Sequence, residues 1–443
     1  MAWKWIATVV GGILPVLCIA HVHIYHLSNG LTLIVKEDHR APVVFSSMWY
    51  RIGSSYEHSG ITGISHVLEH MMFRGTPQYP AGQIEQMISQ KGGEQNAMTG
   101  DDQTVYYQRL STEQWAISFV LEADRMRHLS LAQADFSKEI QVVMEERRLR
   151  TEDNPQAVTM ERFMASAFVN NPYHHPTVGW MTDLQHMTVQ DVRRWYRTWY
   201  APNNAIVIVV GDVKPGAVWA LAQKYFAPLK AAPLPKPKPR TEIAPLGSVH
   251  INVQVPAKLP LLIMGYPVPS LVTTPVSWQP YALEVLSALL GGSDSSRFTK
   301  TLIRGQAIAS VAQSTYDPYT LYNHLLMLVG IPAENHTVSE LKNAFLQQIN
   351  RLQTHPVSMD ELNRVKAQVV AQNMYEKDSL MNQAMNIGVP ESLGLSWRVE
   401  EDHVRRIAAV TPEQIQQVAK IYLIQNHLTT AVLTPSEKIH GKK

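Results

Sequence analysis

The sequence predicts an α+β protein made of two related halves, and three observations lead to that prediction. Helical and strand patterns alternate through the first half of the 443 residues. A stretch rich in Pro, Ala and Lys, from Pro228 to Pro245, then divides the chain near its middle and is typical of an extended, semi-rigid linker. Finally, a set of matching residues precedes a strand pattern on each side of that stretch.

The matching residues indicate an internal duplication. A threonine, a tyrosine and an asparagine come before the strand pattern of residues 205–210, and the same three types come before that of residues 427–433. The spacing from tyrosine to asparagine is the same in both sets, and that from threonine to tyrosine differs by one residue. Such self-similarity is the signature of a repeated unit. The sets are Thr188, Tyr200 and Asn204 in the first half and Thr411, Tyr422 and Asn426 in the second.

Further patterns place the first elements of the chain. Residues 21–26 alternate between apolar and polar side chains, and Asn29-Gly30 is a turn signal before the apolar residues 31–35, so a β-hairpin is expected here. A helix over residues 83–90 and a strand over residues 104–107 are expected further along. The expected segments are 1–20 as signal peptide, 21–228 as N-terminal domain, 229–247 as linker and 248–443 as homologous C-terminal domain.

The composition is that of a globular protein without disulfides. Hydrophobic residues make up 45% of the chain and charged residues 17%, which permits a sizeable core. The formal net charge is +2 and no long basic block occurs, so no surface for nucleic acid or anionic membranes is expected.

The first twenty residues have the pattern of an export signal. Lys4 precedes an apolar run from Trp5 to Ala20, and the run ends in small residues of the kind that signal peptidase recognises. An uncleaved membrane anchor is the alternative, although the run is short for one. Cleavage after Ala20 would remove Cys18, the only cysteine, and would leave no stable membrane span. We therefore expect a periplasmic protein.

One short segment places two imidazoles and a carboxylate on a single predicted helix. His66 and His70 are four residues apart, so in a helix they can share a metal ion, with Glu69 beside them. Ser59 or Thr62 is a candidate N-cap. Two incidental histidines on a buried helix are the alternative. An apolar stripe at helical spacing would anchor the helix, and it consists of Ile64, Val67, Leu68, Met71 and Met72.

Two histidines leave a catalytic zinc site one protein ligand short. A long helical pattern over residues 137–150 offers Glu139 and Glu146, which are seven residues apart and share a helix face. On this argument Glu146 is the third ligand, and Glu139 orients a ligating histidine from behind. On these residues alone, the alternative is that both are ordinary surface glutamates.

The motif His66-x-x-Glu69-His70, followed by a glutamate-rich helix, resembles the zinc peptidases of the pitrilysin/insulinase family, in the bacterial branch similar to mitochondrial processing peptidase. This resemblance implies two homologous α+β domains of the metalloprotease LuxS/processing-peptidase type that form a clam-like chamber. Other segments that follow the family pattern are Asn29-Gly30-Leu31, the stretch from Gly53 to Glu57, Gly63-Ile64-Ser65, the run from His70 to Thr76, Asn96-Ala97, Pro202-Asn203-Asn204 and the run from Val210 to Val213.

The resemblance also implies the roles of the site residues. His66, His70 and Glu146 would bind one zinc ion (Zn²⁺) per chain, and Glu69 would be the general base of a metalloendopeptidase. Glu139 would support the site. The C-terminal domain, which has no His pair, would be inactive.

A peptide substrate is expected to add as an extended strand along Asn96 and Ala97, where backbone hydrogen bonds give affinity with little sequence preference. A plain edge strand without a binding role is the alternative. Extended or unfolded peptides are therefore the expected substrates.

The family's second half usually contributes an Arg and a Tyr that contact the substrate and stabilise the developing oxyanion. Here Arg304 matches the arginine, but Ser310 or Val311 stands where the tyrosine belongs. Tyr316 is nearby, yet a shift of that size along a strand turns its side chain. We therefore expect a heterodimer in which a homologous subunit supplies an Arg/Tyr pair.

Two alternatives to the heterodimer stay open. The first is a self-sufficient homodimeric peptidase, in which another residue replaces the missing tyrosine. The second is a non-catalytic scaffold derived from a peptidase, whose expected mark is the loss of a ligand or of the base. That mark is absent here, since His66, Glu69, His70 and Glu146 are all present.

Overall fold

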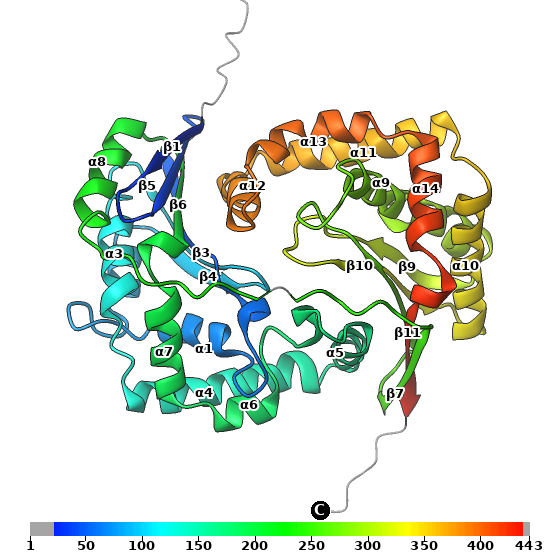
Figure 1. Ribbon diagram of the computed structural model, residues 1–443, viewed down its shortest axis with the longest axis horizontal. Helices are drawn as coiled ribbons and strands as arrows, with labels where there is room; N and C mark the ends of the chain where they lie inside the picture. The colour runs from blue at the N-terminus through cyan, green and yellow to red at the C-terminus, as the bar shows by residue number, and fades with distance from the viewer. Residues whose placement is uncertain (1–21, 239, 437–443) are drawn as a thin grey trace, which may run out of the picture.

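The computed structural model describes residues 22–238 and 240–436. The predicted signal peptide, its cysteine and His21 lie outside these described residues. Within them, no helix combines the length and the apolar character that crossing a membrane requires. The fold consists of two halves, each built from a β-sheet and packed helices (Figure 1).

The first half is built on a six-stranded sheet with the order β1-β2-β6-β3-β5-β4. The neighbours β2 and β6 run parallel, and all other neighbours run antiparallel. The predicted hairpin is confirmed as β1 and β2, and the predicted strand over residues 104–107 lies in β5. The strands are β1 (Val22–His26), β2 (Thr32–Glu37), β3 (Val43–Tyr50), β4 (Glu94–Thr99), β5 (Thr104–Ser111) and β6 (Ala205–Gly211).

The second half repeats this sheet without its first strand. Its order is β7-β11-β8-β10-β9, with β7 and β11 parallel, so these strands correspond in place and direction to β2, β6, β3, β5 and β4. A match of every sheet position supports the duplication that the sequence predicts. The strands are β7 (Val249–Pro256), β8 (Leu261–Val268), β9 (Ala309–Thr315), β10 (His324–Pro332) and β11 (Thr429–Ser436).

The helices follow the same repeat. Those of the first half are α1 (Ile64–Met71), α2 (Gln83–Gln90), α3 (Ile117–His128), α4 (Gln133–Arg147), α5 (Pro155–Ala167), α6 (Met181–His186), α7 (Val189–Trp199) and α8 (Pro215–Tyr225). Those of the second are α9 (Gln279–Gly291), α10 (Val338–Thr354), α11 (Met359–Glu376), α12 (Leu380–Ser392), α13 (Arg398–Ala408) and α14 (Pro412–Tyr422). By chain order and sheet position, α1 corresponds to α9, α4 to α11, and α5 to α12.

The duplicated threonines have the same structural role. Thr188 and Thr411 are the N-caps of α7 and α14, and each forms a capping box with the side chain three residues later. The strands that follow, β6 and β11, are both inner strands, and each runs parallel to one neighbour, β2 or β7. The predicted repeat is therefore a helix cap followed by an inner strand.

Each half sends one helix across to the other half's sheet. α5 packs on β7, β8 and β11, and α12 packs on β3 and β6 (Figure 1). Both helices need a glycine at the contact. A Cβ on Gly265 of β8 would lie 2.6 Å from Phe163 of α5, and one on Gly388 of α12 would lie 2.3 Å from the ring of Trp49. The contact with α12 covers β6 from the other half, and every residue of β6 is buried.

The Pro-rich stretch is extended, as predicted, but it is anchored to the first half. Arg240 donates to the carbonyl oxygens of Ser55 and Glu57, at 3.3 and 3.1 Å. The Glu242 carboxylate accepts from the backbone N–H groups of residues 169–171. The helix predicted over residues 137–150 is found as α4, which ends at Arg147. A wider helical turn follows it over Arg148–Glu152.

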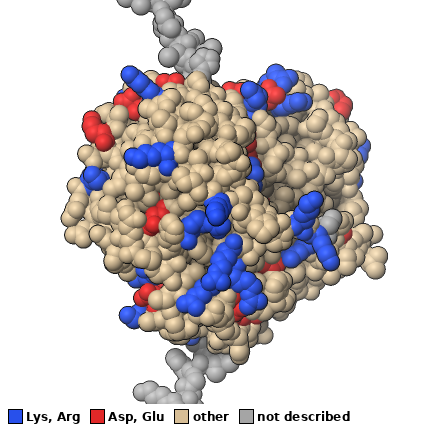
Figure 2. Space-filling view, turned by 60° about the vertical axis from the view of Figure 1, so that its left-hand side comes forward, with Lys and Arg blue, Asp and Glu red and all other residues tan. Residues whose placement is uncertain are grey.

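The surface agrees with the nearly balanced charge. On the face shown in Figure 2, Lys and Arg side chains lie in small separate groups, with Asp and Glu among them and uncharged surface between.

Candidate active site

The helix that carries the His motif is fixed by a glycine and by its apolar stripe. Gly63 precedes α1 with φ +86°, and a Cβ at this position would lie 2.5 Å from the carbonyl oxygen of Val178. Only glycine satisfies both constraints. The predicted stripe is confirmed, since its five residues are each at most 1% exposed: Ile64, Val67, Leu68, Met71 and Met72.

The predicted N-cap of this helix is wrong. Thr62 donates its hydroxyl to Asp183 at 2.6 Å, and no Ser59 contact caps the helix. Instead, the fully buried carboxylate of Glu57 accepts from the N–H groups of Gly63 at 2.7 Å and Ser65 at 2.8 Å. A carboxylate at a helix N-terminus satisfies free N–H groups and complements the helix dipole. Glu57 thus holds the start of α1 in place.

Two helices bring the three predicted metal ligands together. His66 Nε2 lies 3.8 Å from Glu146 Oε1, and His70 Nε2 lies 3.3 Å from Glu146 Oε2. One ligand atom from each residue lies within 4.8 Å of the others, and the parts of the chain that the structure describes contain no second group of this kind. Two imidazole nitrogens and one carboxylate oxygen are a donor set of catalytic zinc sites. The site therefore fits a zinc ion.

Glu139 lies behind the triad, in the position that the spacing predicts. Its carboxylate is 3% exposed, and Oε2 lies 3.4 Å from His70 Nδ1. The other oxygen, Oε1, lies 2.5 Å from the guanidinium of Arg74. A carboxylate on the outer nitrogen of a ligating histidine fixes its tautomer and orientation. Glu146 has a comparable neighbour, since Arg150 lies 2.7 Å from its Oε1.

Burial changes the pKa of two side chains of the motif, His66 and Glu69. Burial, reinforced by His70, lowers the pKa of His66 to about 4, so its imidazole is neutral and able to ligate a metal at neutral pH. Burial also raises the pKa of Glu69, which makes its carboxylate a stronger base. Thr99 opposes that rise by donating its hydroxyl to Glu69 Oε2.

The edge strand β4 runs beside the motif. It is the last strand of its sheet, as predicted for residues 96 and 97, and it packs against α1. Asn96 is exposed and Ala97 half-buried. Thr99, at the end of the same strand, contacts Glu69. Glu57 and Arg74 lie in segments that follow the family pattern, but the sequence assigned no role to either of them, or to Thr99.

The second half does not add a contact to the triad. Arg304 is 63% exposed and lies 3.6 Å from Asp294, and no described hydrogen bond or ion pair joins it to the His66 group. The hydroxyl of Ser310 donates to the carbonyl of Ile331 at 3.2 Å. The hydroxyl of Tyr316 is also engaged, because it donates to Pro269 at 2.6 Å.

Comparisons with known proteins agree with this geometry. The model of the insulinase family, peptidase family M16, matches residues 32–179, and that of the peptidase M16 inactive domain matches residues 186–369. The zinc protease PqqE of Helicobacter pylori is 30% identical over 422 residues, which cover 92% of each chain. The resemblance to the mitochondrial branch stays a prediction.

Solved structures extend the similarity to the whole fold. A protease from Helicobacter pylori has a TM-score of 0.88 at 28% identity, over 94% of this chain and 100% of that one. The periplasmic protease PqqL from Escherichia coli has a TM-score of 0.78 at 17% identity, over 94% of this chain but 48% of that one. The likeness to PqqL shows the fold alone. With the match to PqqE over almost the full length, these findings show that the chain belongs to the insulinase family of peptidases, family M16.

Proposed function

We propose that this protein is a zinc metalloendopeptidase that hydrolyses extended or unfolded peptides. One observation carries the proposal: His66, His70 and Glu146 converge on one point, and Glu69 lies on the same helix. The names of the relatives support it, since PqqE of Helicobacter pylori is called a zinc protease.

Zinc held by these three residues would act as a Lewis acid that polarises a carbonyl group and makes water more acidic. Glu69 takes a proton from the attacking water and returns it to the leaving amine. The raised pKa of Glu69 suits both steps. A carboxylate whose pKa lies closer to neutral pH is a stronger base toward water, and once protonated it can still return the proton to the amine. Thr99 holds the Glu69 carboxylate in one orientation.

Glu139 acts through His70. By accepting from His70 Nδ1, it leaves Nε2 free for the metal, and Arg74 fixes the carboxylate in turn. Glu139 is therefore a positioning residue in this proposal.

The substrate lies along β4. Asn96 and Ala97 belong to an edge strand, which can pair with an extended peptide on its open side. The Asn96 side-chain oxygen accepts from the Ala97 N–H at 2.9 Å, and a bound peptide would replace this contact. Pairing through the backbone selects for extended conformation more than for sequence. A peptide bond beyond Ala97 would then lie close to Thr99 and Glu69.

A homologous partner subunit is the finer part of the proposal. No tyrosine stands at the expected position after Arg304, where Ser310 or Val311 is found instead. The hydroxyl of the nearby Tyr316 already donates to the carbonyl oxygen of Pro269. We infer that the partner supplies an Arg/Tyr pair for the oxyanion. A self-sufficient homodimer is the second candidate.

Export to the periplasm is also proposed, from the apolar run and small residues before His21. Fractionation of cells that produce the full chain tests it. Recovery of the protein in the cytoplasm with its first twenty residues intact would refute the export.

The decisive experiment uses the purified full chain and quenched fluorescent peptides. Zinc content should be one ion per chain, and Glu69→Gln should keep the zinc but lose activity by roughly 10²–10⁴-fold. Glu145→Gln is the matched control, because Glu145 is on α4 but its side chain is 57% exposed and bonded to Arg148. It should behave as the wild type.

Three outcomes decide between the candidates. Hydrolysis by metal-loaded Glu69→Gln at the wild-type rate would refute the role of Glu69. Full turnover by the isolated chain as a monomer or homodimer would remove the partner. Absence of bound zinc after growth in zinc would favour the non-catalytic scaffold.

A further inference from the structure

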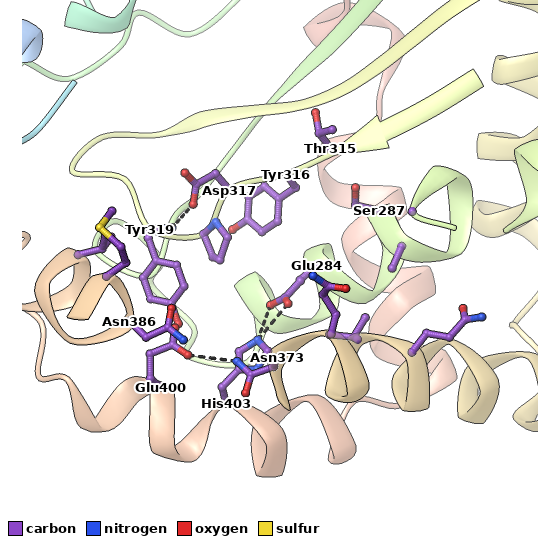
Figure 3. Close-up of a pocket in the computed structure, with 18 of the residues that line it drawn as sticks. Glu284, Ser287, Thr315, Tyr316, Asp317, Tyr319, Asn373, Asn386, Glu400 and His403 are labelled. Carbon is purple, nitrogen blue, oxygen red and sulfur yellow. Dashed lines mark hydrogen bonds and ion pairs between the residues drawn. The ribbon is translucent and has the colours of Figure 1, made fainter. Parts of the chain in front are cut away.

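A second polar site lies in the other half of the molecule. A cavity of about 800 Å³ is enclosed by α9, α11, α12, α13 and the loop after β9 (Figure 3). Gln103, in the turn after β4, is its contribution from the first half. The polar side chains that matter most on its wall are Glu284, Tyr319, Asn373, Asn386, Glu400 and His403.

This cavity is the counterpart of the metal centre in the duplicated fold. α9 corresponds to α1, and it lines the cavity with three residues at positions i, i+3 and i+4, the spacing of the metal motif: Glu284, Ser287 and Ala288. The middle residue also keeps its contact. The Ser287 hydroxyl lies 2.9 Å from that of Ser314 on β9, as Glu69 contacts Thr99 on β4. The second half thus has three residues at the spacing of the metal motif, but they are not the histidines and glutamate of that motif.

The replaced residues do not suit a metal ion. Ala288 has no ligand atom, and α11 presents Gln368, Gln372 and Asn373 where α4 presents carboxylates. Among the described residues, the only group of three His, Cys, Asp or Glu side chains close enough for an ion is the His66 group. We therefore expect the ligand of this cavity to be larger than a single metal ion, with several polar atoms that reach separate residues of the wall.

Several buried polar atoms around the cavity have no partner within the protein. Asn373 is 9% exposed, and its Oδ1 accepts no hydrogen bond, although its Nδ2 donates to Glu400 at 3.3 Å. The Nδ2 of Asn386 likewise has no acceptor. Because buried polar atoms without partners are costly, these atoms point to a ligand that can satisfy them.

The charge of the cavity selects a cation. Among the described residues, no Lys or Arg lines it. His403 Nε2 lies 3.0 Å from both oxygens of Glu284. Burial lowers the pKa of His403, but hydrogen bonding to Glu284 and the charges of Glu284 and Glu400 together outweigh it, so the net pKa is raised and the contact favours the charged imidazole. Glu400 forms no direct ion pair among the described side chains, although the charge of His403, one turn along α13, acts on it. Asn373 Nδ2 donates to the Glu400 carboxylate at 3.3 Å. The ring of Tyr319, another residue of the cavity wall, lies beside Glu400 (Figure 3).

We propose that this cavity binds the ammonium or guanidinium group of an organic cation, with Glu400 as its charged anchor and Asn373 as a second acceptor. The cation can be a free amine or a Lys or Arg residue of a peptide, since Gln103 places the cavity close to the end of β4. Binding of the cation needs neither zinc nor Glu69. The proposal can therefore be tested independently of the proposed peptidase activity.

Calorimetric titration tests the proposal on the full chain with Glu69→Gln, which removes turnover. The ligands are agmatine, an arginine-containing peptide and the same peptide with citrulline, which has the shape of arginine without its charge. We expect saturable binding of the arginine ligands and at least roughly tenfold weaker binding of the citrulline peptide. Glu400→Gln should weaken arginine binding to a similar extent, because it removes the anchoring charge.

Glu401→Gln is the matched control, because it makes the same change at the exposed neighbouring residue of α13. It should bind as the parent does. If Glu400→Gln fails to fold, Asn386→Arg gives a second test, since its own guanidinium should fill the cavity and abolish binding.

If agmatine and the arginine peptide each bind when titrated separately, the cavity is a site for free cations. Binding of the arginine peptide alone would identify a peptide subsite. Equal affinity for arginine and citrulline peptides would overturn the proposal, as would the absence of any binding at millimolar ligand. Identical affinities of Glu400→Gln and Glu401→Gln would overturn it too.

Discussion

Replacement of Glu139 by glutamine should weaken zinc binding without unfolding the protein. The carboxylate faces two donors, His70 Nδ1 at 3.4 Å and Arg74 at 2.5 Å, and it is 3% exposed. A glutamine side chain keeps the shape but has one acceptor oxygen. Whichever way its amide turns, an N–H₂ group then faces one of the two donors.

The size of this effect follows from the contact that is lost. Removing the outer partner of a ligating histidine costs about 10- to 100-fold in metal affinity. The distance to His70 is longer than an ordinary hydrogen bond, so the lower end applies. We therefore expect zinc affinity to fall by about tenfold, equivalent to roughly 1.4 kcal/mol.

A competition titration against a chromogenic chelator measures this change. Glu145→Gln provides the reference, because it removes an equal charge from the exposed face of the same helix. The thermal midpoint of the metal-free proteins should be similar in both variants, which separates metal affinity from folding. If Glu139→Gln and Glu145→Gln bind zinc equally well, Glu139 does not position His70.

Two further predictions concern the helix that crosses between the halves. Gly388→Ala should destabilise the protein by about 1–3 kcal/mol in urea unfolding, because its Cβ would overlap the buried ring of Trp49. Gly216→Ala in α8, which has open space, should not, and equal stability of the two variants would refute the close contact. Asp38, which accepts from Gln383 of α12 at 2.8 Å, has its pKa lowered to about 2, chiefly by hydrogen bonding to Arg40. Since the folded pKa lies below the unfolded one, the stability from Asp38, about 2 kcal/mol, is present above pH 4 and is lost as pH falls toward 2. The deficit of Asp38→Asn should therefore shrink on acidification, whereas Asp378→Asn, at an exposed carboxylate, should show little deficit at pH 7; an unchanging deficit would contradict the assignment.

The metal-binding helix was predictable because all its signals are local. The spacing of His66, Glu69 and His70 and that of the apolar stripe describe two faces of one helix, and both faces are found. Glu139 and Glu146 were predictable in the same way, since their interval places them on one face of α4.

The support of that helix was not predictable, because it comes from elsewhere in the chain. Ser59 and Thr62 stand where an ordinary N-cap stands, but Asp183 engages Thr62, and Glu57 reaches the free N–H groups first. Thr99 contacts Glu69 only because β4 folds back beside α1. Such contacts depend on the tertiary fold, and no single segment contains them.

The crossing of α5 and α12 has the same cause. An amphipathic pattern shows that a helix buries one face, but it does not show which sheet receives that face. The duplication predicts two similar halves without indicating that each covers the other. The glycines at the contacts, Gly265 and Gly388, acquire their meaning only beside Phe163 and Trp49.

The two equivalent helices explain how one fold came to hold two different sites. α1 starts at Gly63 and at the buried carboxylate of Glu57, which fix the start of the helix that carries His66 and His70. α9 has no such cap, and with Ala288 it lacks one ligand, so no ion can bind. Glu284, at the place of His66, still carries a charge and pairs with His403 instead. Without that ligand, the described residues of the second half form no group that could hold a metal ion, but they still line a polar cavity. Gln103, in the turn after β4, contributes to that cavity, so the proposed peptidase site and the proposed cation site would contact separate parts of one bound peptide.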